Sequence, residues 1–278
     1  NEASTLGAVA RRVGRLALAA AAVVMVAWGL RLIVQVLAFR DPFAPLSDDV
    51  TLLLFQTFWG TVWMVQGGFV VLLGVALAAA ARVDGRDGVG RGGPAATVGR
   101  RPAPWLLAGV AVAGLVATMA FSSHAVGVES GRALALTADA VHDLAAGRWI
   151  GTLAVILSAG GRGTGGDDPR LFAEQIRRFS PLALLGGATL VGMGAFLSWT
   201  HLPTVSDLWE TGYGRLLSGK VLLAFAILAL GFRNWRRGLP VAHTESGAAE
   251  IRRWGRGEVL LAVAVLVVTA VLVHATRP

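Results

Sequence analysis

Residues 16–37 read LALAAAAVVMVAWGLRLIVQVL, a run of 22 residues in which Arg31 is the only charged side chain. A helix needs about 20 apolar residues to cross the hydrocarbon core of a bilayer. Six further stretches reach this length alone or with their flanks: 58–81, 104–121, 134–157, 179–197, 216–232 and 259–273. The sequence therefore predicts an all-α, polytopic transmembrane helix bundle with seven spans in this chain.

The overall composition agrees with a membrane protein. Of the 278 residues, 55% are hydrophobic and 15% are charged, and the mean hydropathy is +0.64. Soluble domains carry about 25% charged residues. The chain has no cysteine, which excludes disulfides, thiolate metal sites, iron–sulfur clusters and cysteine nucleophiles. It also has no P-loop, nucleophile elbow or zinc-protease motif, so we expect a protein that is not an enzyme.

The arginines predict the orientation of the chain in the membrane. Eighteen of the 24 arginines lie before the first predicted span or in the connections after the second, fourth and sixth spans. Because positively charged connections stay in the cytoplasm, residues 1–15 are expected there and Pro278 outside, in a bacterial inner (plasma) membrane. The net charge of +8 is thus explained by arginines in the connections that are expected in the cytoplasm. The expected partner is a lipid bilayer and not nucleic acid.

Two short stretches predict an internal repeat. TFWGTVWMVQ at 57–66 resembles TGYGRLLSGK at 211–220, and both place a Thr-x-aromatic-Gly core where an outer loop enters a helix. The offset spans four helices, so the two copies share their orientation, as in a parallel repeat. This predicts half-repeats at 1–121 and 122–278, with the first helix of the first half missing before residue 1 and eight spans in the intact protein. Chance similarity is the alternative.

Histidines gather on the predicted outer side. His124, His142, His201 and His274 all lie at or near outer ends of the predicted spans, whereas His243 lies in a basic connection and is interpreted as a solvated residue. Imidazole is a ligand for copper, zinc and iron. These four histidines are therefore candidate metal ligands, with His274 the weaker one.

The fourth predicted span carries the most unusual polar residues, because Asp139, His142 and Asp143 interrupt an apolar stretch. Ionisable side chains inside a bilayer are costly and mark functional sites by default. At helical spacing, Asp139, His142 and Trp149 share one stripe, with Asp143 at its edge. A carboxylate could orient the imidazole, as groups around metal ligands do. The alternative is a hydrogen-bonded polar patch near the outer interface.

Methionine is a second possible ligand type. Met119 lies near the outer end of the third predicted span, at a depth close to that of the outer histidines. Thioethers suit Cu(I), while imidazole suits both oxidation states of copper. The predicted copper-ion ligands, for Cu+ or Cu2+, are His124, His142, His201 and Met119, with Asp139, Asp143 and Trp149 around them. For Met119, helix packing is the alternative.

Two other functions remain open on the residues alone. A b-type haem carrier would use histidine pairs as axial ligands, either His124 with His142 or His142 with His201. A membrane dock for a periplasmic copper chaperone would need no transport pathway. The absorption spectrum separates haem from copper, and radiocopper uptake separates a transporter from a dock.

Several stretches of this chain together resemble the CopD copper-resistance membrane proteins. The similarity runs from about His124 to Pro278, and 57–66 resembles the upstream half of that family. The stretches that carry it include SSHA at 122–125, ADAVHDLAAGRWIGTL at 138–153, RRFSPLALLGGATLVGMGAFLSW at 177–199, TGYGRLLSGKVLLAFAILALGFRN at 211–234 and RGEVLLAVAVLVVTAVLVHATRP at 256–278.

The resemblance implies an eight-helix inner-membrane protein that takes up periplasmic copper toward the cytoplasm, beside or fused to a CopC-like copper-binding module. It carries over His124 and His142 as the family-like histidines, whereas His201 and His274 rest on the predicted topology alone. The chain departs from the family in two respects. Its first helix is absent, and Arg148 stands where an apolar or small residue is expected.

Overall fold

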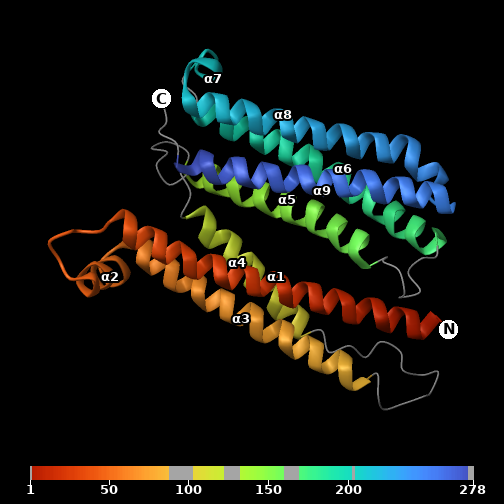
Figure 1. Ribbon diagram of the computed structural model, residues 1–278, viewed down its shortest axis with the longest axis horizontal. Helices are drawn as coiled ribbons and strands as arrows, with labels where there is room; N and C mark the ends of the chain where they lie inside the picture. The colour runs from red at the N-terminus through yellow and green to blue at the C-terminus, as the bar shows by residue number, and fades with distance from the viewer. Residues whose placement is uncertain (1, 88–102, 122–131, 160–168, 202–203, 275–278) are drawn as a thin grey trace. The chain divides into compact units, whose positions relative to one another are not determined.

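The computed structural model describes residues 2–87, 103–121, 132–159, 169–201 and 204–274. Regular structure in these residues is entirely helical, which confirms the all-α prediction (Figure 1). The chain forms two compact units, residues 1–128 (unit 1) and 129–278 (unit 2). Each unit is described here by itself.

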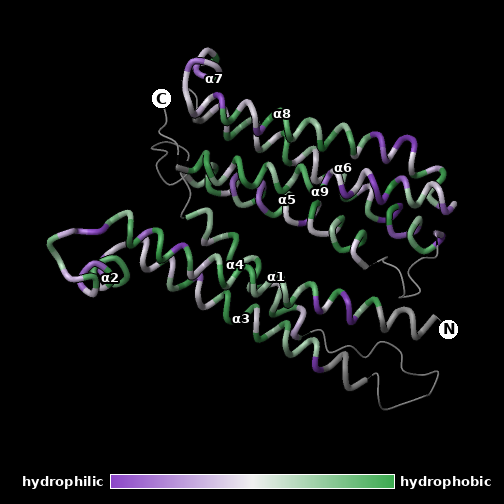
Figure 2. Tube along the Cα trace, viewed as in Figure 1, coloured by the Kyte–Doolittle hydropathy of each residue, from purple (hydrophilic) through white to green (hydrophobic). Residues whose placement is uncertain are grey.

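Seven helices in the described residues are long and apolar enough to cross a membrane, as predicted. Figure 2 shows the hydrophobic colour along these helices. The two stretches that looked short are extended by their flanks, to Gly212–Val241 and Glu245–Val273. The seven spans are Val9–Ala38, Phe58–Arg82, Ala103–Ala120, Ala133–Ser158, Pro169–Trp199, Gly212–Val241 and Glu245–Val273.

Many large apolar side chains on these helices are not covered by protein. Val23 is 67% exposed, and Leu222 and Leu260 are each 70% exposed. Large exposed apolar surfaces mark contacts with partners or membranes. A helix satisfies its own backbone hydrogen bonds, so such a surface is stable in hydrocarbon. The chain is a multi-pass membrane protein.

Unit 1 is built around α3 (Phe58–Asp87), which packs against both α1 (Glu2–Ala38) and α4 (Ala103–Ala120). Small residues bring these helices close together. A Cβ placed on Gly114 of α4 would lie 2.3 Å from the Phe69 ring of α3, so only glycine fits there. Close approach through small residues is how helices associate in lipid.

The contact between α1 and α3 also contains polar and aromatic groups. Trp28 and Trp63 stack with ring centroids 4.1 Å apart. Each indole N–H donates to the backbone carbonyl of the other tryptophan, at 3.0 and 3.1 Å. Arg31 donates to the Gln66 side-chain oxygen at 3.0 Å. The one charged side chain of the first apolar run therefore has a partner inside unit 1.

Two short helices lie in connections that the sequence analysis left without structure: α2 (Leu46–Phe55) and α7 (Asp207–Glu210). The first turn of α2 contains Asp48 and Asp49, whose negative charges stabilise a helix N-terminus. Asp49 also pairs with Arg40. Each short helix packs against the long helix that follows it.

The junctions from these short helices into α3 and α8 share one geometry. The Thr57 hydroxyl accepts from the Gly60 N–H at 2.9 Å and donates to the Leu53 carbonyl at 2.6 Å. The Thr211 hydroxyl accepts from the Gly214 N–H at 2.9 Å and donates to the Asp207 carbonyl at 2.7 Å. Both copies of the Thr-x-aromatic-Gly core therefore cap a helix in the same way. The predicted repeat of four helices stays a prediction.

Unit 2 contains four long helices. They are α5 (Arg132–Ala159), α6 (Pro169–His201), α8 (Gly212–Arg233) and α9 (Glu245–His274). α5 packs against α6 and α9, and α8 packs against α9 (Figure 1). After α8 the chain continues through a π-helical turn, η2 (Asn234–Gly238), and a short η3 (Leu239–Val241) before α9 begins.

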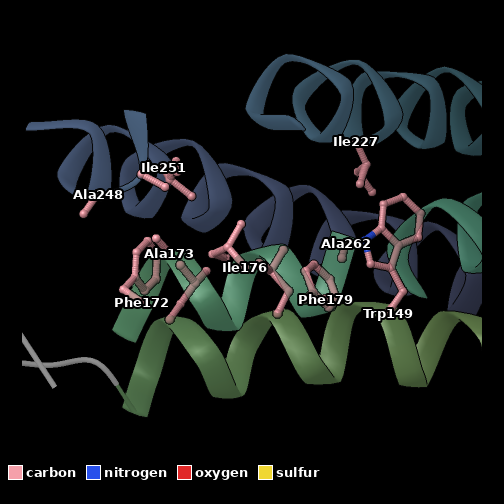
Figure 3. Close-up of a cluster of buried hydrophobic side chains, with 12 residues drawn as sticks. Trp149, Phe172, Ala173, Ile176, Phe179, Ile227, Ala248, Ile251 and Ala262 are labelled. Carbon is pink, nitrogen blue, oxygen red and sulfur yellow. The ribbon is translucent and has the colours of Figure 1, made fainter. Parts of the chain in front are cut away.

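The core of unit 2 is apolar, and all four long helices contribute to it (Figure 3). Trp149 of α5 is its largest side chain at 7% exposure. Carbons of the Trp149 side chain lie 3.5 and 3.7 Å from where Cβ atoms would stand on Gly186 and Gly187 of α6. Trp149 thus lies against the glycines of α6, on the helix that also carries His142 two turns earlier.

Candidate functional site

His142 lies on α5 with its ring against α6. A Cβ placed on Gly194 would lie 3.5 Å from His142 Cε1 and 3.9 Å from Nδ1, so the missing side chain leaves space for the ring. The backbone carbonyl of Leu190, one turn earlier on α6, faces the same ring. Helix α6 thus forms one wall of the space that holds the imidazole.

The imidazole of His142 has an unpaired nitrogen. Its Nδ1 is buried and forms no hydrogen bond within the part of the chain that the structure describes. Buried polar atoms in proteins nearly always have a partner. A neutral imidazole nitrogen with a free lone pair is also the group that binds metal ions. His142 is therefore available as a ligand.

Three charged residues belong to the same part of unit 2. Asp139 precedes His142 by three residues on α5 and Asp143 follows it directly, while Lys220 comes from α8. Lys220 interacts electrostatically with both carboxylates and with His142. We call these four residues the His142 cluster. The two acidic side chains attract cations to the site, while Lys220 balances part of their charge.

Sequence reasoning did not assign a role to Lys220. The signal was present, because Lys220 is the only lysine of the chain and lies inside an apolar span. Such residues are functional candidates by default. What the sequence could not show is that Lys220 of α8 interacts electrostatically with Asp139 and Asp143 of α5.

Trp149 lies in the apolar core, where glycines of α6 border its ring. Its proposed place beside His142 stays a prediction.

The other predicted ligands fall in several places. Met119 lies on α4 of unit 1 and is 53% exposed. His201 and His274 are the last residues of α6 and α9, so their backbones lie at the end of unit 2 where α5 and α8 begin (Figure 1). The structure does not describe their side chains, and His124 lies outside the described residues altogether.

The described side chains do not form a complete metal centre. Among them, no three of the histidine and acidic residues lie close enough together to hold one ion. The His142 cluster therefore offers one imidazole, with two carboxylates on the same helix that add negative charge. Its chemistry is the attraction and binding of a cation, with further ligands still to be supplied.

Residues 173–272 match the family model described as Copper resistance protein D, which confirms the resemblance to the CopD family. The matched stretch contains all of α7 and α8 and most of α6 and α9, and so includes Lys220. It starts after α5, so His124 and His142 lie outside it. Their carry-over from the resemblance stays a prediction.

The Copper transport protein CutJ of Bacillus subtilis (strain 168) is 25% identical to the chain over 225 residues, which is 81% of this chain and 38% of that protein. The chain thus spans well under half the length of this relative. No solved structure shows significant similarity to the chain.

Proposed function

We propose that this chain takes up copper from the periplasmic side of a bacterial inner membrane and that the His142 cluster binds the ion on its way. The proposal is supported by the CopD match of residues 173–272 and by the seven membrane spans. It makes the chain a copper-related membrane protein, like the relative whose name describes copper transport.

The observation that carries the proposal is the unpaired Nδ1 of His142 inside an apolar span. Imidazole suits both oxidation states of copper. Asp139 and Asp143 add negative charge beside it, which favours a cation over a neutral ligand. An inside-negative membrane potential favours cation entry by about 2.3 kcal/mol per charge for each 100 mV.

In this proposal the positive charge of Lys220 takes the place of the copper ion's charge while no copper is bound. Its ammonium group interacts with Asp139 and Asp143 when no metal is bound. An arriving cation would compete with Lys220 for the same carboxylates. The cluster would then keep its charge nearly balanced in both states, which lowers the cost of carboxylates in an apolar span.

The remaining ligands and the partner belong to the same proposal. His124, His201 and Met119 would complete the coordination from the periplasmic end, with His274 as a weaker candidate. A CopC-like copper-binding module, separate or fused, would deliver the ion there. The orientation that this requires, with residues 1–15 in the cytoplasm, rests on the distribution of arginines.

Copper binding by the purified protein in detergent tests the site. His142→Ala should remove one bound copper per chain or weaken its affinity at least about tenfold, since most of the ligand strength is lost. The matched control is His243→Ala, which removes an exposed histidine near η3. Unchanged stoichiometry and affinity in His142→Ala would refute the assignment.

Two further measurements separate the alternatives. Radiocopper uptake into proteoliposomes distinguishes transport from docking of a chaperone, because a dock binds copper without moving it inward. The absorption spectrum tests for haem, since a Soret band would contradict a copper-only protein. The family model and the relative reported above are named for copper and not for haem.

A further inference from the structure

A second ionisable side chain lies deep inside unit 2, apart from the His142 cluster. Glu258 of α9 is 3% exposed, and Gln66 of unit 1 is the other polar side chain buried to this degree among the described residues. A carboxylate in an apolar span is costly. The copper proposal gives Glu258 no role.

The surroundings of Glu258 contain one hydrogen-bond donor. Its Oε1 accepts from the Asn234 side-chain amide at 2.6 Å. Its Oε2 lies 3.6 Å from where a Cβ would stand on Gly231, and Cζ2 of Trp149 lies 3.8 Å from the same point. The second oxygen therefore faces glycine and an indole ring, and not a charged group.

The arginines close to Glu258 in the fold are engaged elsewhere. Arg233 donates to Glu250 at 2.7 Å and lies over the Trp254 ring at 4.1 Å. Arg252 lies over the Phe172 ring at 4.4 Å. None of the ion pairs found in the described residues includes Glu258. A buried carboxyl group without a cation partner is held most cheaply in its neutral, protonated form.

Asn234 connects this carboxyl group to the solvent-exposed end of the bundle. It is the first residue of the π-helical turn η2, in which the Leu239 N–H reaches back to the Asn234 carbonyl. Such turns occur frequently at functional sites. Asn234 is half-buried, while Trp235, Arg236 and Arg237 after it are exposed. One side chain therefore separates Glu258 from groups in contact with water.

We propose that Glu258 is a proton-binding site, which exchanges its proton with solvent at the η2 end of unit 2 as copper passes through the unit. When a cation enters unit 2, the carboxyl group releases its proton to the solvent at this end, and the resulting carboxylate balances the charge of the ion. When the cation leaves, the carboxylate takes up a proton from the same solvent. The coupling, but not the proton site, rests on the proposed function.

Infrared spectroscopy of the full chain in lipid vesicles without copper tests the proton site. The C=O band of a protonated carboxyl group should titrate with pH in the wild type and be lost in Glu258→Gln. The matched control is Glu250→Gln, which removes an exposed carboxylate of the same helix that pairs with Arg233. A band that titrates identically in wild type and Glu258→Gln overturns the proposal.

A second variant covers the case in which Glu258→Gln fails to fold. Asn234→Ala keeps the carboxyl group and removes its donor, so the midpoint of the band titration should move away from the wild-type value. An unmoved midpoint overturns the role of Asn234 in holding and releasing the proton.

The coupling is tested by the pH dependence of radiocopper uptake into proteoliposomes. Lowering the pH should slow uptake in the wild type and in Glu250→Gln, because Glu258 must release its proton when the ion enters, and the change with pH should be at least about tenfold smaller in Glu258→Gln. Copper uptake that does not depend on pH in the wild type overturns the coupling. An absence of copper uptake contradicts the proposed function instead, and the infrared titration then decides the proton site alone.

Discussion

The imidazole of His142 has room on its α6 side because residue 194 is glycine. A Cβ alone would lie 3.5 Å from the ring, at ordinary contact distance, but the γ carbons of a larger residue would reach the ring itself. Gly194→Val should therefore weaken copper binding at least about tenfold by filling the space beside Nδ1. Equilibrium dialysis of the purified protein measures this.

Gly192, two residues earlier on α6, supplies the control for Gly194→Val. A Cβ on Gly192 would meet no atom within 4 Å, so Gly192→Val changes the same residue type on the same helix without touching the ring. We expect wild-type affinity from Gly192→Val. Equal affinities in both variants would show that the space beside His142 has no part in binding.

Lys220 balances carboxylates that lie in an apolar span. Lys220→Met should lower the free energy of unfolding by about 1–3 kcal/mol, because Asp139 and Asp143 are left without their cation. Adding Asp143→Asn should recover part of this loss, since one of the uncompensated charges is removed. Thermal unfolding in detergent measures all three proteins.

Arg215→Met is the control for Lys220→Met, because Arg215 is an exposed cation on the same helix. It should change the free energy of unfolding by less than about 0.5 kcal/mol. A double variant no more stable than Lys220→Met would contradict the pairing of Lys220 with Asp143.

At the scale of the residue, sequence reasoning found the polar groups of α5 because they interrupt a clear apolar stretch. Sequence reasoning did not identify Glu258, since the predicted span began at residue 259 and Glu258 was assigned to the basic connection before that span. The helix in fact begins at Glu245. A hydropathy average over this stretch mixes Glu258 and the arginines at 252, 253 and 256 with their apolar neighbours. It therefore cannot show that the Glu258 side chain points into the core.

Among the elements, the junctions into α3 and α8 depend on glycine as well as on the threonine cap. A Cβ on Gly60 would lie 2.2 Å from the Leu53 carbonyl oxygen, and one on Gly214 would lie 1.9 Å from the Asp207 carbonyl oxygen. At both places a short helix packs so closely on the start of the long one that no side chain fits. At both positions, therefore, the threonine of the Thr-x-aromatic-Gly core caps the long helix and the glycine allows the short helix to pack against its start.

Gly214→Ala should therefore destabilise unit 2, because the backbone of α7 must move away from α8. Overpacking of this kind costs about 1–3 kcal/mol, which thermal unfolding in detergent detects. Gly219→Ala is the control on the same helix, where a Cβ meets no atom within 4 Å. Comparable stabilities of the two variants would contradict this, because helix propensity alone favours alanine at both positions.

The long helices were predictable as elements because each is apolar over a whole span. The short helices α2 and α7 were not predicted, since their stretches, LSDDVTLLLF and DLWE, lie among turn-forming and acidic residues. Their packing against α3 and α8 adds stability that local sequence does not contain.

For the whole molecule, an odd number of spans predicts that the two ends of this chain lie on opposite sides of the membrane. The arginines predict the cytoplasmic side for residues 1–15. A phosphatase reporter that works only outside the cytoplasm should be active after Pro278. The same reporter fused after Ala242, which follows six spans, should be inactive.

A fluorescent reporter that folds only in the cytoplasm provides the control, because it should show the reverse pattern at both positions. If both fusions report the same side, one of the two last helices does not cross the membrane. If the pattern is inverted throughout, the positive-inside prediction is wrong, and with it the assignment of the His142 cluster to the periplasmic half.

The sequence by itself determined the number of spans, the all-α class and the resemblance to the CopD family. These depend on apolar length and on local motifs, which are sums over neighbouring residues. Only the tertiary structure decided that Lys220 of α8 interacts electrostatically with the carboxylates of α5, that Gly194 leaves space beside His142 and that Glu258 is buried against Asn234. Such pairings depend on how each helix is rotated about its axis, and that rotation is set by packing between helices distant in sequence.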